Sequence, residues 1–156
     1  INYYAFEPSP TVFSNLENNV KNQFLFNKAV HKENFNDIEF FISDEWGDSS
    51  VIPIENYTKK ILIKTIKLDD ILKKINSPVK FLKIEAEGLE PEILEGLKES
   101  INFVKYISID CGFERGIEKK STIAECSNYL INNGFKMLDF GAPRIVCLFK
   151  NNKFKD

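Results

Sequence analysis

The fold is decided by residues 79–97, which read Val79-Lys-Phe-Leu-Lys-Ile-Glu-Ala-Glu-Gly-Leu-Glu-Pro-Glu-Ile-Leu-Glu-Gly-Leu97. Residues 79–86 are nearly continuous in apolar character, which is typical of a parallel strand covered on both faces. Gly88 interrupts this strand, and Pro91 opens a helix, because its missing N–H is harmless in the first turn. The inner face of that helix is expected to consist of Ile93, Leu94, Leu97 and Ile101. The stretch therefore predicts a strand–turn–helix unit.

Strands and helices alternate along the chain on both sides of this unit. The expected strands are residues 2–6, 24–30, 39–42, 51–54, 60–66, 79–86, 104–109, 135–140 and 145–149. Helices are expected after Ser9, from Asp69, from Pro91 and after Thr122, which has capping-box spacing with Glu125. This order predicts one α/β domain over residues 1–156, with an open, mostly parallel twisted sheet and helices on both faces. A small strand insertion and a C-terminal antiparallel hairpin would complete it.

The composition excludes several classes of partner. The 21 basic and 23 acidic side chains give a net charge of -2, which argues against a nucleic-acid or membrane surface. The three cysteines are too few and too widely spaced for a disulfide framework or a zinc site, and His31 is the only histidine. We therefore expect a cytoplasmic protein without a metal centre.

Glu7 follows the first expected strand and is the first candidate for chemistry. A carboxylate at the C-terminal end of a strand in such a sheet can accept both hydrogen bonds from a ribose diol. The alternative is a solvated carboxylate at the end of a strand.

Several segments, in order, resemble the FkbM family of S-adenosylmethionine-dependent methyltransferases. The most specific is residues 81–96, and the others are residues 5–10, residues 65–72, Ser108-Ile-Asp-Cys-Gly-Phe-Glu-Arg115 and the pair Gly134-Phe135. The resemblance implies a Rossmann-like class I methyltransferase fold, S-adenosylmethionine as cofactor and O-methylation of a sugar, glycan or other small-molecule acceptor. It implies that Phe6, Glu7, Pro8, Ala29, Val30 and Glu85 contact the cofactor.

The sequence departs from the family pattern in two ways. Glu85 replaces the usual aspartate and is one methylene longer. The family's first strand and glycine-rich loop have no counterpart here, so we expect them to precede Asn2 and this domain to be incomplete at its N-terminus.

Glu85 and Glu87 are the candidate catalytic residues. They lie at the end of the strand expected over residues 79–86, where alternation places both side chains on one side and either could act as a base on a hydroxyl. The alternative is that one of them caps the following helix. Trp46, Ser50 and Asp110 are the candidate acceptor-binding residues, because they lie in a loop and at a strand end beside the expected site.

Two other functions fit part of the pattern. A nicotinamide-dependent oxidoreductase would also use Glu7 on a ribose, although the signature over residues 81–96 favours the methyltransferase. A non-catalytic binding domain that retains the fold is the second alternative.

Overall fold

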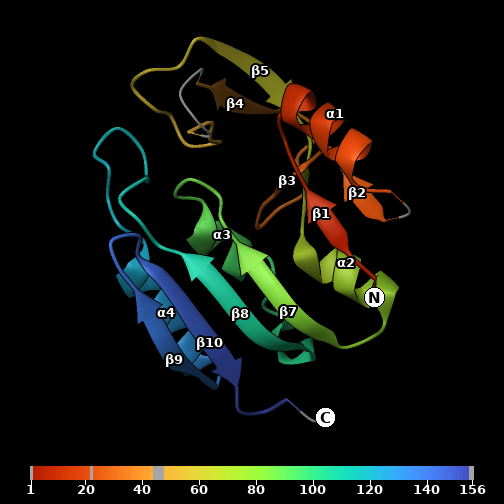
Figure 1. The fold of residues 1–156 in the computed structure, drawn as a ribbon, viewed down its shortest axis with the longest axis vertical. Coiled ribbons are helices and arrows are strands. Elements are labelled where there is room, and N and C mark those ends of the chain that lie inside the picture. Colours follow the sequence, from red (N-terminus) through yellow and green to blue (C-terminus); the bar gives the residue numbers. More distant parts are fainter. Residues whose placement is uncertain (1, 22, 44–47, 155–156) are drawn as a thin grey trace.

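The computed structural model describes residues 2–21, 23–43 and 48–154 as an α/β structure (Figure 1). Its helices are α1 (Pro10–Asn19), α2 (Leu68–Ile75), α3 (Glu90–Glu95) and α4 (Ile123–Asn132), with a short 3₁₀ helix at Ile101–Phe103. Its strands are β1 (Tyr4–Phe6), β2 (Phe24–Phe26), β3 (Ala29–Val30), β4 (Ile38–Ile42), β5 (Lys59–Ile63), β6 (Thr65–Ile66), β7 (Val79–Ile84), β8 (Val104–Asp110), β9 (Phe135–Gly141) and β10 (Val146–Asn151). In the described ranges, no helix has the length and apolar character that a bilayer crossing requires.

The largest sheet has four strands in the order β7-β8-β10-β9. β7 and β8 are parallel, with Phe81 opposite Tyr106. β10 runs antiparallel to both β8 and β9, which confirms the predicted C-terminal hairpin. Figure 1 shows β1, β7 and β8 pointing in the same direction, so their carboxyl ends lie along one edge of the molecule.

The other described strands form three separate pairs rather than one continuous sheet. β1 and β2 are parallel, β3 and β6 are parallel, and β4 and β5 are antiparallel. The strand expected at residues 24–30 is divided between two of these pairs, because β2 bonds to β1 whereas β3 bonds to β6. The hydrogen bonds therefore define four separate sheets among the described residues, and not the single, mostly parallel sheet that the sequence predicted.

The strand expected at residues 51–54 does not form. Ser50 makes one antiparallel bridge to Phe41, and the chain then bends at residues 51 and 52. Pro53 follows, and it has no N–H with which to continue a ladder. The small strand insertion is therefore the β4–β5 pair, to which Ser50 adds a single bridge at Phe41.

The main hydrophobic core lies between the four-stranded sheet and three of the helices. Leu94 and Leu97 near α3, Ile107 and Ile109 of β8, and Leu130 of α4 are fully buried there. Residues of α2 join the same cluster. Phe81 and Lys83 of β7 face away from this core, and Phe81 is 56% exposed. The core thus fixes β7 and β8, whose carboxyl ends carry the candidate site.

Candidate functional site

The loop that follows β7 is held in an unusual conformation. β7 ends at Ile84, and Glu87 has a φ of 49°, in the left-handed region that L residues seldom adopt. The predicted strand over residues 79–86 is therefore two residues too long, and alternation along a strand does not apply to Glu85 and Glu87. Ser50 donates a hydrogen bond from Oγ to the Glu87 carbonyl at 3.0 Å. This bond attaches the β4–β5 pair to the end of β7.

Gly88 closes the loop because no side chain fits at its position. Its φ is 91°, and a Cβ there would lie 2.4 Å from the Arg115 Cα. Arg115 donates to the Gly88 carbonyl and makes a two-pronged ion pair with Glu92, at 2.9 and 2.6 Å. The helix cap expected from Glu85 or Glu87 is absent, since Leu89 occupies the N-cap of α3 and makes no side-chain cap.

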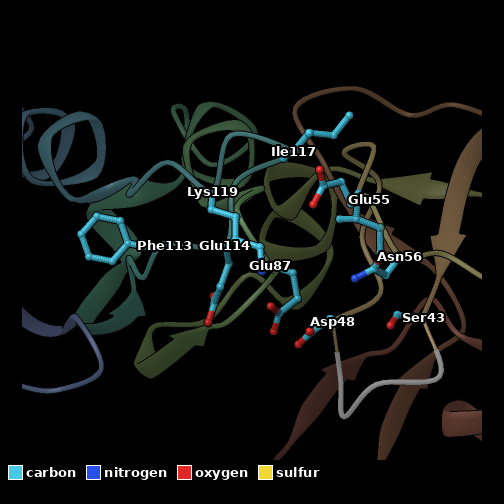
Figure 2. A pocket seen from close by; sticks show the side chains of 11 residues that line it. Ser43, Asp48, Glu55, Asn56, Glu87, Phe113, Glu114, Ile117 and Lys119 are labelled. Carbon is cyan, nitrogen blue, oxygen red and sulfur yellow. The ribbon is translucent and has the colours of Figure 1, made fainter.

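An open pocket of about 90 Å³ lies beside this loop (Figure 2). Its lining combines carboxylates, amide and hydroxyl groups with three apolar side chains. The lining residues are Ser43, Asp48, Ile54, Glu55, Asn56, Glu87, Phe113, Glu114, Gly116, Ile117 and Lys119. Figure 2 shows the Glu87 and Asp48 carboxylates on the same side of the pocket. Glu114 follows the strand that ends at Asp110, a position from which the sequence made it a plausible substrate-side residue, whereas Asp48 was not a predicted acceptor-binding residue. Both reach the pocket because two distant loops fold onto Glu87.

The electrostatics of the pocket favour an uncharged Glu87. Burial, followed by the nearby charges of Glu114 and Asp48, raises the pKa of Glu87 to about 8. Burial also raises the pKa of Glu114, and the neighbouring Asp110 charge adds to that effect. At neutral pH Glu87 is therefore mostly protonated, and it gains proton-accepting capacity as the pH approaches 8.

Glu85 is in the opposite electrostatic state. Its carboxylate pairs with Lys83 and, at 2.6 Å, with Arg144 in the β9–β10 hairpin turn. The hydrogen bond from Lys83 lowers the pKa of Glu85 the most, and that from Arg144 adds to the effect. A carboxylate held ionised by two cations is a weaker base than Glu87. Of the two predicted catalytic residues, the geometry favours Glu87, the one that lines the pocket.

Asp110 ends β8 and is not among the residues that line the pocket. It is 3% exposed, and its Oδ2 is 2.7 Å from Arg144, although without the alignment of a hydrogen bond. Its Oδ1 accepts the Gly112 N–H at 3.2 Å. Its carboxylate is therefore engaged within the protein.

The two other predicted acceptor-binding residues have different outcomes. Ser50 is 2% exposed, and its hydroxyl also accepts the Ile52 N–H at 3.1 Å. It therefore supports the Glu87 backbone and is turned inward. Trp46 lies outside the described residues.

The predicted cofactor residues lie around β1 and β3. Glu7 is half-buried, and its Oε1 accepts the Ser9 N–H at 2.7 Å. Burial raises the pKa of Glu7, and the Ser9 hydrogen bond partly opposes this effect. The predicted helix start at Ser9 and Pro10 is confirmed, but Ser9 makes no side-chain cap. Its N–H instead orients the Glu7 carboxyl.

The remaining predicted cofactor contacts are apolar. Phe6 is half-buried and stacks on Phe26 with ring centroids 4.9 Å apart, and Pro8 is also half-buried. Ala29 is 4% exposed within a small cluster with Phe40 and Ile63, and its N–H donates to the Lys64 carbonyl at 3.1 Å. Val30 is half-buried against the main core. The structure places these residues and Glu7 on neighbouring strand pairs.

Metal-binding groups are absent from the ranges described. No group of three or more histidine, cysteine, aspartate or glutamate side chains there could hold a metal ion. The three cysteines form no disulfide and are buried in the main core.

Comparisons with known proteins agree with this arrangement. The crystal structure of a methyltransferase FkbM from Methylobacillus flagellatus KT has a similar fold, with a TM-score of 0.60 at 18% sequence identity. The match covers 96% of this chain and 36% of the crystallised chain, so this chain spans about a third of that protein. No curated protein sequence matches this chain.

The sequence itself gives the stronger assignment. The pattern of the methyltransferase FkbM domain matches residues 1–137, which include β1 with Glu7 and β7 with the loop that carries Glu87. On that match, the chain belongs to the FkbM methyltransferase family.

Proposed function

We propose that this domain takes part in S-adenosylmethionine-dependent O-methylation and that its strands belong to a Rossmann-like class I methyltransferase fold. The observation that carries the proposal is the family match over the segments that hold Glu7 and Glu87. β1 and β7 point in the same direction, so a ribose ligand and a proton acceptor would lie at one edge of the molecule (Figure 1).

The residues around β1 and β3 fit an adenosyl group. Each oxygen of the Glu7 carboxylate has two lone pairs, so Oε1 can accept a ribose hydroxyl while it keeps the Ser9 N–H. Val30 is half-buried and offers an apolar side chain for an adenine ring, whereas Ala29 is buried and would support Val30 from behind. Glu85 could contact an amino group only by sharing its carboxylate with Lys83 and Arg144.

Glu87 is the proposed general base. When bound, S-adenosylmethionine supplies a methyl group that is already activated, so the protein mainly has to align the acceptor oxygen. Glu87 would accept the proton of the acceptor hydroxyl as the oxygen–carbon bond forms. Because its pKa is about 8, the ionised fraction rises between pH 7 and 9. The rate of methylation should rise over the same interval.

The lining of the pocket narrows the choice of acceptor. Four carboxyl groups, those of Asp48, Glu55, Glu87 and Glu114, line the pocket together with the cation of Lys119, and this excess of acidic groups disfavours acceptors that carry phosphate or carboxylate. Phe113 and Ile117 are 65% and 57% exposed at its rim, where an apolar ring could pack. We therefore propose a neutral hydroxyl acceptor, such as an uncharged sugar or a secondary metabolite with an apolar ring.

The first test is calorimetric titration of the full-length protein with S-adenosylmethionine and, separately, with NAD. We expect binding of S-adenosylmethionine, and Glu7→Ala should weaken it at least about 30-fold, since hydrogen bonds to a charged group are lost. Glu17→Ala, an exposed change on α1, is the matched control and should leave the affinity unchanged. Binding of NAD alone would favour the oxidoreductase, and binding of neither would favour a non-catalytic domain.

The second test concerns Glu87. Glu87→Gln should reduce methyl transfer to a hydroxyl acceptor about 100-fold with little change in cofactor affinity, and it should remove the rise in rate towards pH 8. Glu118→Gln, an exposed change in the nearby loop, is the control. An unchanged pH profile in Glu87→Gln would remove Glu87 from the reaction.

A further inference from the structure

Glu90 is a fully buried acid beside the site. It begins α3 and is 1% exposed. A buried carboxyl is tolerated only where hydrogen bonds replace those it made with water. Its Oε1 accepts the Ala86 N–H at 3.0 Å and the Gly88 N–H at 3.1 Å. Its Oε2 accepts the Thr122 hydroxyl at 3.1 Å.

The two N–H groups that Glu90 binds flank Glu87. A residue held at a φ of 49° requires surrounding contacts to keep it there, since this conformation is unfavourable by itself. Glu90 supplies one contact on each side of Glu87, and Ser50 holds the Glu87 carbonyl. The direction of the Glu87 side chain therefore depends on the carboxyl of Glu90.

Thr122 connects this arrangement to the rest of the fold. It is 1% exposed, occupies the N-cap of α4 and donates its N–H to the Cys111 carbonyl at 3.3 Å. Its side chain makes no cap for α4 and is directed to Glu90 instead. The loop after β7 is thus fixed to the beginning of α4 through one carboxyl group.

We infer that Glu90 is the positioning residue of the site, which orients Glu87 towards the pocket by binding the peptide N–H groups on either side of it. Its effect on catalysis rests on the proposed function. Its effect on the loop does not, because the hydrogen bonds exist without substrate.

The matched variants are Glu90→Ala and Glu90→Gln. Alanine leaves both N–H groups without their acceptor. Glutamine keeps the length of the side chain, so its amide oxygen can accept both N–H groups while its NH₂ donates to Thr122 Oγ1. A positioning role therefore predicts loss in the first variant and rescue in the second.

Two measurements on the ligand-free protein detect the role directly. Amide hydrogen exchange at Ala86 and Gly88 should accelerate at least about tenfold in Glu90→Ala, beyond any change at the β8 amides that report global unfolding. In ¹³C NMR, the titration of the Glu87 carboxyl should move from about pH 8 towards that of an ordinary glutamate as the side chain turns to solvent. Glu90→Gln should retain protection of the two amides and an elevated Glu87 titration.

Kinetics give the third readout. Glu90→Ala should lower kcat about tenfold or more and shift its pH profile, with little change in KM for the cofactor. Glu90→Gln should restore most of kcat. A general loss of stability would lower the folded fraction without moving the pH profile.

The outcomes separate the two proposals. A folded Glu90→Ala protein with unchanged amide exchange and unchanged Glu87 titration would overturn the role of Glu90, even if the enzyme methylates its acceptor. Altered exchange and titration in a protein that binds no S-adenosylmethionine would support Glu90 and reject the proposed function. If Glu90→Ala does not fold, Glu90→Asp, one methylene shorter, replaces it with the same expected changes, and their absence would equally overturn the role.

Discussion

The two sides of the candidate site are built differently. The β7–β8 side rests on a four-stranded sheet and on side chains such as Leu94, which is fully buried. The β1–β2 side has three-residue strands, and α1 has no buried residue. Tyr4 stacks on Phe24, at 4.5 Å, and Phe6 on Phe26, and Tyr4, Phe6 and Phe26 pack only partly buried against the main core. We therefore expect the β7–β8 side to be the more rigid of the two and the β1–β2 side to open at lower free energy.

The largest expected effect tests this contrast with one type of substitution on both sides. Leu94→Ala should lower the free energy of unfolding by about 3–5 kcal/mol, because it leaves a cavity in the main core. Leu16→Ala, on the half-buried face of α1, should lower it by about 1 kcal/mol or less. Urea unfolding followed by circular dichroism measures both. Equal losses would mean that the two sides are equally important for stability.

A second pair of substitutions tests how firmly the loop after β7 is held. Gly88→Ala should lower the free energy of unfolding by about 2–3 kcal/mol, since the added Cβ meets the Arg115 backbone and the φ is 91°. Gly141→Ala is the control in the hairpin, because its Cβ would meet only the Val146 carbonyl oxygen, at 3.6 Å. The same unfolding experiment applies, and a harmless Gly88→Ala would contradict the close approach of Arg115.

The smallest effect concerns pH. Glu87 has a folded pKa of about 8, above its unfolded value, so its contribution to stability is complete below about pH 4.5 and is lost as pH rises through 8. Glu87→Gln should match the wild type near pH 4 and exceed its stability by about 1–2 kcal/mol at pH 9, a value reduced because water screens a half-exposed group. Thermal unfolding across this pH range measures the difference. If the difference in stability between the two proteins does not change with pH, burial and the neighbouring carboxyl groups do not raise the pKa of Glu87.

The sequence predicted the elements of the β7–β8 side well because local signals there agree. Pro91 opens a helix, Gly134 takes a left-handed φ of 93° and the last two strands form a hairpin. The same reasoning predicted a single strand over residues 24–30, which was wrong. Nothing in the local sequence indicates that β2 pairs with β1 whereas β3 pairs with β6. Pairing is decided by distant segments.

The candidate site was predicted in part for the same reason. Glu87 follows from its place after the strand that ends at Ile84, but its pKa depends on Asp48 and Glu114, which lie far from it in the sequence. Thr122 and Glu125 have the spacing of a capping box, yet the Thr122 hydroxyl binds Glu90. A buried acid 32 residues away competed successfully with the local cap. Local spacing cannot reveal such a competitor.

The length of the β9–β10 turn determines whether Arg144 can neutralise two carboxylates near the pocket. Arg144 extends from the β9–β10 turn to Glu85 and Asp110, and its side chain is 60% exposed. A single insertion or deletion in that turn would withdraw one cation from two carboxylates without altering a residue of the pocket. Relatives with different turns would then differ in the electrical potential at the pocket mouth, and a designer could retune that potential from a turn that borders the site without lining the pocket.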